Sequence, residues 1–225
     1  MLEASLRQHP DATLEQLARA WLRRLKHLRR AAGPVRDLDV HRKLLEDWVG
    51  KEPPDPEEEK LDAWLKGERK RLAHSAQKQI RKNQRGLAER QAAFLTALNR
   101  TPRMRSPLPA DIVALESLMR AADAMPLLDA ENLHDFRKAA KKARYIAESG
   151  AGTELAKALK RIQDAIGEWH DWLCLSQEAK SALGEDARGL TRAFENQVER
   201  HFAAALKTTQ STLARLCGEW MASAS

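Results

Sequence analysis

The chain has 225 residues, which suffices for one large domain or for two smaller ones with cores of their own. Lys and Arg number 39 against 32 Asp and Glu, so the formal net charge of +7 favours a polyanionic partner such as nucleic acid, anionic lipid or a polyphosphate. Two cysteines exclude a disulfide scaffold, no apolar run approaches the about 18 residues that cross a bilayer, and no signal region opens the chain. We therefore expect a soluble, cytoplasmic protein with no membrane partner.

The N-terminal half shows apolar residues at helical spacing. A first helix is expected over 13–32, where Gly33-Pro34 stops it, and a second over 35–50. The proline-rich segment 51–56 breaks the pattern, and 57–100 then has the pattern of one long, mostly polar helix.

The turn-rich segment 101–109 is expected to link two helical halves, 1–100 and 110–225. Five further helices are predicted in the second half, over 110–124, 130–149, 153–166, 168–182 and 186–220. Because the helices are long and the loops short, we expect an all-α protein built of antiparallel helical bundles.

A weak internal repeat relates the two halves. Residues 25–40 (LKHLRRAAGPVRDLDV) align without gaps on residues 159–174 (LKRIQDAIGEWHDWLC), with five identities. One identity pairs Gly33 with Gly167, and we expect both glycines to serve one purpose, either a close helix contact or a bend. Chance similarity between amphipathic helices is the alternative, but the shared glycine favours a duplication that yields two related bundles.

The segment 133–148 combines a cationic face with an alanine-rich face. On a helix, at about 100° per residue, five side chains lie within about 60° of one direction, namely His134, Arg137, Lys138, Lys141 and Tyr145. Lys142 and Arg144 flank this stripe. Like charges one turn apart repel, and a charged face without alternating sign is less typical of plain solvated surface. The segment therefore predicts an anion-binding face.

Three runs of sequence resemble one family. The run HDFRKAAKKARYIAE at 134–148 is similar to the signature helix of the CHAD family, the conserved histidine α-helical domain. The run GPVRDLDV at 33–40 resembles that family's Gly-x-x-Arg-Asp-x-Asp-Val run, and IQDAIGEWHD at 162–171 resembles its counterpart in the second half. The resemblance extends over roughly 14–215.

The resemblance implies two four-helix bundles related by a pseudo-two-fold axis. Basic residues of both bundles would line a groove that binds inorganic polyphosphate, in the cytoplasm and at polyphosphate granules. Carried onto this chain, the implied binding residues are His134, Arg137, Lys138, Lys141, Lys142, Arg144 and Tyr145, followed by Lys26, Arg30, Arg36, Lys160 and Arg161. The family implies no catalytic residue, metal or cofactor.

One departure from the family concerns the start of the chain. The family has a basic helix, His-x-x-Arg-Val-x-x-Arg-Arg-Leu, in its first half as well. By the offset of the repeat, the counterpart of His134 falls before Met1, and 1–7 resembles the tail of that helix. We therefore expect the first bundle to lack part of its first helix.

Two other functions are also compatible with the sequence. A nucleic-acid-binding protein fits the net charge, although the stripe lacks the Asn or Gln that would read bases. A metal-dependent phosphohydrolase is suggested by two His-Asp pairs, His134-Asp135 and His170-Asp171. Adjacent residues on a helix point about 100° apart, so neither pair readily chelates one ion, and we expect a binding protein rather than an enzyme.

Overall fold

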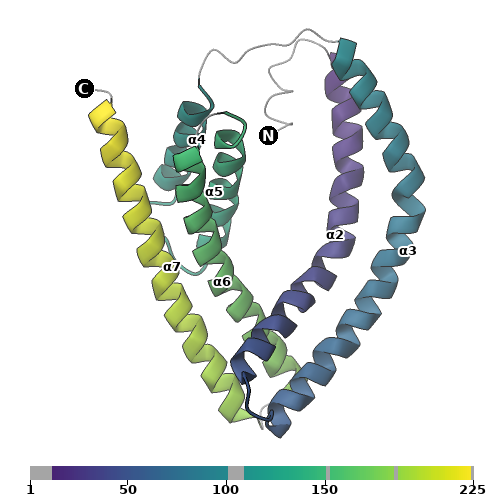
Figure 1. Cartoon of the computed structure of the whole chain (residues 1–225), viewed down its shortest axis with the longest axis vertical. Helices are drawn as coiled ribbons and strands as arrows, with labels where there is room; N and C mark the ends of the chain where they lie inside the picture. Colours follow the sequence, from purple (N-terminus) through teal and green to yellow (C-terminus); the bar gives the residue numbers. More distant parts are fainter. Residues whose placement is uncertain (1–11, 101–108, 151–152, 185–186, 224–225) are drawn as a thin grey trace. The chain divides into compact units, whose positions relative to one another are not determined.

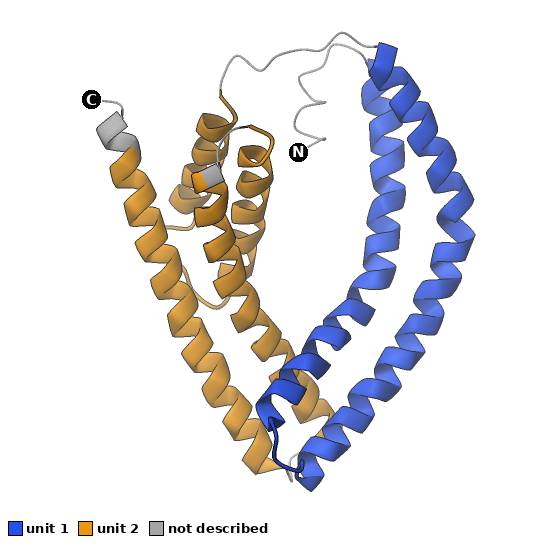
Figure 2. Cartoon of the chain, viewed as in Figure 1, with its two compact units in different colours: residues 1–105 blue, residues 106–225 orange. Residues whose placement is uncertain are grey.

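The structure is a computed structural model, and it describes residues 12–100, 109–150, 153–184 and 187–223. Over these ranges the chain is all-α, with six helices, no strands, and antiparallel packing of helix pairs (Figure 1). It divides into two compact units, Met1–Arg105 and Ser106–Ser225 (Figure 2). Of the expected linker at 101–109 only Pro109 is described, and the expected helix remnant at 1–7 lies outside the described residues.

Unit 1 contains one long antiparallel pair, α2 (Ala12–Val49) and α3 (Pro56–Arg100). The turn between them has clear local causes. Gly50 adopts a left-handed φ of 69°, and its N–H donates to the carbonyl of Glu46 at 3.0 Å, which ends α2. Asp55 and Glu58 then form a reciprocal capping box, each backbone N–H donating to the other's carboxylate at 2.9 Å, which starts α3. The described part of unit 1 thus holds two of the four helices expected of a full bundle.

The helix stop expected at Gly33-Pro34 is wrong, because α2 continues through both residues. An interior proline removes one hydrogen bond and crowds the preceding turn, at a cost of about 3 kcal/mol. Leu38 and Leu45, which lie beyond the proline, are 4% and 2% exposed, and their burial offsets that cost. Figure 1 shows α2 changing direction along its length, as a proline kink would produce.

Unit 2 contains α4 (Ala110–Ala124), α5 (Leu133–Ala147), α6 (Thr153–Leu183) and α7 (Arg188–Ser223). Successive helices pack on one another, so α5 has α4 on one side and α6 on the other. One apolar core draws on all four helices, with Leu118, Phe136, Ile162 and Ala205 among its fully buried members. Unit 2 therefore positions α5 by packing on both sides.

The helix break expected between 153–166 and 168–182 is also wrong, because α6 runs without interruption through Gly167. A glycine inside a helix costs only about 0.5–1 kcal/mol relative to alanine. Its neighbours Ile166 and Trp169 are 0% and 2% exposed, so core packing outweighs the local preference.

The two copies of the repeat lie on equivalent elements, since each falls on the first helix of a long antiparallel pair, α2 with α3 and α6 with α7. Their glycines do not share one purpose, however. A Cβ atom on Gly167 would lie 2.9 Å from Nη2 of Arg137, whereas no described atom comes within 4 Å of a Cβ on Gly33. The difference arises because α5 packs on α6.

Candidate anion-binding site

Helix α5 turns one face to the core and the other away from it. Phe136, Ala140, Ala143 and Ala147 are all fully buried, which confirms the apolar face predicted from the sequence. Alanine side chains are short, so they allow neighbouring helices to approach closely. The basic residues of α5 consequently lie at the border of the α5–α6 contact and on the outer surface of unit 2.

Arg137 is the basic residue of α5 that contacts α6 most directly. Its Nε donates to the backbone carbonyl of Gln163 at 3.2 Å, and its guanidinium lies over the Cα of Gly167. Arg137 forms no ion pair with any acidic side chain in the described part of the chain. The guanidinium is thus positioned by the backbone of α6 and retains its full charge for an external anion.

Two histidines face each other across the α5–α6 contact. The ring centroids of His134 and His170 lie 4.5 Å apart, with the planes tilted by 38°. His134 Nδ1 is buried and has no hydrogen-bond partner among the described residues. His170 Nε2 lies 3.7 Å from Sγ of Cys174, one turn further along α6.

The surroundings shift the pKa values of the two imidazoles in opposite directions. Burial lowers the pKa of His134, and the neighbouring His170, Lys138 and Arg137 lower it further against the opposing charge of Asp135. The contact with Cys174 raises the pKa of His170, although burial and Arg137 oppose the change. An arriving anion would favour the charged form of both rings, so the site can take up protons as it binds.

The remaining basic residues of α5 differ in how well their charges are compensated. Lys138 pairs with Asp135 at 2.7 Å, and Nε of Arg144 lies 3.4 Å from a carboxylate oxygen of Glu148. Lys141 and Lys142 have no carboxylate partner in the described ranges. Compensation is therefore partial, and the uncompensated charges belong to Arg137, Lys141 and Lys142.

Tyr145 brings Lys141 and Arg144 together. Nζ of Lys141 lies 5.8 Å from the centroid of the tyrosine ring, and Cζ of Arg144 lies 4.9 Å from it. The side chain of Arg144 is only 15% exposed, whereas Tyr145 is 40% exposed. Arg144 therefore supports the ring from the protein side, and the ring edge stays available to solvent.

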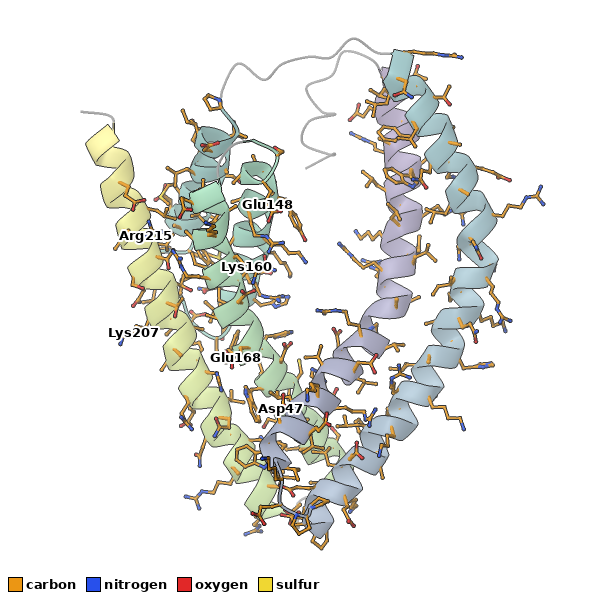
Figure 3. All side chains as sticks on the ribbon, viewed as in Figure 1. Asp47, Glu148, Lys160, Glu168, Lys207 and Arg215 are labelled. Carbon is orange, nitrogen blue, oxygen red and sulfur yellow. The ribbon has the colours of Figure 1, made fainter. Side chains whose placement is uncertain are left out.

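The other predicted binding residues lie elsewhere. Lys160 and Arg161 are exposed on α6, where Lys160 pairs with Asp164; Figure 3 labels Lys160 on α6 and Glu148 at the end of α5. Lys26 and Arg30 are exposed on α2 in unit 1. Arg36, also on α2, is 79% exposed and lies 3.8 Å from a carboxylate oxygen of Asp37. The structure thus gathers the seven α5 residues on one helix, while the other five lie on α6 and in unit 1.

The sequence did not place the α6 side of the site, namely Gln163, Gly167 and His170, beside the basic face of α5, although Gly167 stood out in the repeat and His170 in a His-Asp pair. A signal was present, because residues 163, 167, 170 and 174 follow the i, i+4, i+7, i+11 spacing of one helix face. Within the described ranges, no group of three or more His, Cys, Asp or Glu side chains is arranged to hold a metal ion. None of the described helices is both long enough and apolar enough to span a bilayer.

The fold and this site define a class of all-α helical-bundle protein in which an arginine and a histidine of a cationic helix contact the adjacent helix. The model of the CHAD domain matches residues 2–180, which is most of the chain, so the protein belongs to the CHAD domain family. This match confirms the resemblance given by the runs at 33–40, 134–148 and 162–171. No curated protein and no solved structure matches the chain.

Proposed function

We propose that the protein binds inorganic polyphosphate through the cationic face of α5. The observation that carries the proposal is the group of three cations, Arg137, Lys141 and Lys142, that have no carboxylate partner in the described part of the chain. Polyphosphate binding is the general function of the CHAD family, which supports the same reading. The contributions of Lys26, Arg30 and Arg36 from unit 1, and of Lys160 and Arg161 from α6, stay predictions.

The binding would follow the physics of a charged backbone. Polyphosphate is a flexible chain with about one negative charge per phosphate, so each contacting Lys or Arg releases condensed counterions as it would from nucleic acid. Arg137 and Lys141 stand one turn apart, about 6 Å along the helix, and can contact successive parts of one chain. Arg137 offers a planar fork for two oxygens, whereas Lys141 and Lys142 act as mobile point charges.

Substitution of the proposed contacts tests this function. We expect Arg137→Ala/Lys141→Ala to weaken the binding of long-chain polyphosphate by at least about tenfold, because each charge-assisted contact is worth about 1.5–3 kcal/mol. The matched control is Arg192→Ala/Lys207→Ala, which removes the same charge from exposed positions on α7. Equal affinities of the wild type and the α5 variant in a binding titration would refute the proposal.

In this proposal the protein is a binding module and performs no chemistry on its ligand. Incubation of the protein with polyphosphate and Mg²⁺ or Mn²⁺ should release no phosphate. Release of phosphate that depends on the protein would support a phosphohydrolase instead. Competition between short polyphosphate and DNA at equal phosphate concentration distinguishes the nucleic-acid alternative, since preference for DNA would favour that function. Association with polyphosphate granules in cells is a further expectation of the proposal.

A further inference from the structure

Unit 1 contains a second basic feature, a small cleft between α2 and α3. Its lining consists of Ala20, Arg23, Arg24 and His27 from α2 and Arg90 from α3, around a volume of about 260 Å³. The four α2 positions follow the i, i+3, i+4, i+7 spacing of a single helix face. Three arginines and a histidine therefore converge on one concave site, and no acidic residue contributes to the lining.

The cleft interrupts the apolar contact between the two helices. The rings of Trp21 and Phe94 stack at 5.4 Å between centroids, as expected of a helix–helix seam. Within the same seam, however, Arg24 donates to Oδ1 of Asn83 at 2.7 Å. Arginine and asparagine in such a contact stabilise the fold less than leucines would, and sequences depart from a local packing rule most often where a function requires it.

The arginines of the cleft are held by neutral groups. Asn83 orients Arg24, and Nη1 of Arg90 donates to the carbonyl of Gly86 at 3.2 Å. A Cβ built on Gly86 would lie 3.4 Å from that Nη1, so the guanidinium lies close against α3 at this position. Because these partners carry no charge, the guanidinium groups are positioned without being neutralised.

The residues that line the cleft also lack a counter-charge. None of Arg23, Arg24, His27 and Arg90 forms an ion pair with a residue in the described ranges. A larger cavity of about 820 Å³, nearer the turn between the two helices, also contains cations, but there Arg42 and Lys66 both pair with Asp62. The cleft around Arg24 thus gathers like charges whose repulsion a bound anion would relieve.

We propose that this cleft is a separate binding site for a small inorganic phosphate anion, such as orthophosphate, pyrophosphate or tripolyphosphate. Guanidinium groups match phosphate oxygens in geometry and charge. The volume falls below the about 300–1,000 Å³ of pockets for drug-sized ligands, which favours a few phosphoryl groups over a nucleotide. The site shares no residue with the α5 face, so it does not rest on the function proposed above.

Titration with tripolyphosphate at low salt tests the proposal. The measurement uses Arg137→Ala/Lys141→Ala as the background, so that the α5 site does not contribute. We expect Arg24→Gln/Arg90→Gln to weaken binding by at least about tenfold. The charge-matched control Arg29→Gln/Lys82→Gln, at exposed positions outside the cleft, should change the affinity by no more than about twofold. Equal losses in both variants, or no loss in the cleft variant, would overturn the proposal.

Arg24 and Arg90 also contact the helix pair, so the folding of their variant is checked by circular dichroism. If that variant unfolds, the same titration is performed with Arg23→Gln/His27→Gln, whose side chains are exposed, and is judged by the same two outcomes. Repeating the titration with long-chain polyphosphate shows whether the cleft takes a free short anion or a segment of a longer chain. Loss of the α5 site leaves this result unaffected, so the two proposals can fail independently.

Discussion

The position of Arg137 depends on a residue with no side chain. Gly167 lets the guanidinium lie directly on α6, where the carbonyl of Gln163 accepts its Nε–H. A hydrogen bond to a backbone carbonyl orients an arginine without neutralising it, which an ion pair would do. At the scale of single residues, the site is therefore built by packing as much as by charge.

Replacing that glycine should separate binding from stability. In Gly167→Ala the new Cβ would meet Nη2 of Arg137 at 2.9 Å, so the guanidinium must move away from Gln163. We expect weaker polyphosphate binding, while stability stays unchanged or rises by up to about 1 kcal/mol from better helix propensity. Gly33→Ala is the matched control, because no side chain among the described residues comes within 4 Å of its Cβ, and it should change stability alone. Unaltered polyphosphate affinity in Gly167→Ala, measured beside thermal unfolding, would contradict this role.

The facing histidines should make the proposed polyphosphate binding depend on pH. The pKa of His134 lies below its ordinary value and that of His170 above it, so as pH falls His170 is protonated first and His134 later. A polyanion favours both charged forms, so it should raise both pKa values, and affinity should increase from about pH 7.5 to about pH 5.5. NMR titration of the imidazole resonances, with and without polyphosphate, measures the shift directly. Identical titration curves in both conditions would rule out a contact between these rings and the ligand.

At the scale of helices, local signals fixed some boundaries and misplaced others. The predicted helix at 110–124 coincides with α4, and the end predicted at residue 50 agrees with Gly50, whose left-handed backbone follows α2. Gly33-Pro34 and Gly167 carry the local signal of a helix break, but the burial of their neighbours, which the sequence alone does not give, carries each helix through them. Long-range packing decides such positions, and propensity does not.

Pro34 should limit the stability of α2. Pro34→Ala restores a backbone hydrogen bond and removes the clash with the preceding turn, so we expect the free energy of unfolding to rise by about 1–3 kcal/mol. Urea denaturation followed by circular dichroism measures the change. A variant of unchanged or lower stability would mean that the fold depends on the bend itself.

The α5 side of the candidate site could be predicted from the sequence, whereas its contacts with α6 could not. Spacing alone gave the face of α5 that carries Arg137 and Lys141, because one helix fixes the directions of its own side chains. It did not give the contact of Arg137 with Gly167 or of His134 with His170, since both join segments about thirty residues apart through the packing of α5 on α6. The pairing of Lys138 with Asp135 also did not follow from the spacing, because it depends on which rotamer each side chain adopts.

At the scale of the whole molecule, the net charge of +7 attracts any polyanion, so affinity by itself does not establish a site. The two units each contribute exposed cations, and both would add to a diffuse attraction. A localised site differs from such attraction in one respect, namely that a charge removed from it matters more than the same charge removed elsewhere. Salt dependence provides the most direct comparison, because it counts the contacts that release counterions.

The decisive measurement is the affinity for long-chain polyphosphate across a series of salt concentrations, for the wild type, Arg137→Ala/Lys141→Ala and Arg192→Ala/Lys207→Ala. The α5 variant should show a logarithmic salt slope shallower by about 1.4, because each lost contact removes about 0.7. The α7 variant should keep the slope of the wild type. Parallel lines for the wild type and the α5 variant would contradict a polyphosphate site on α5.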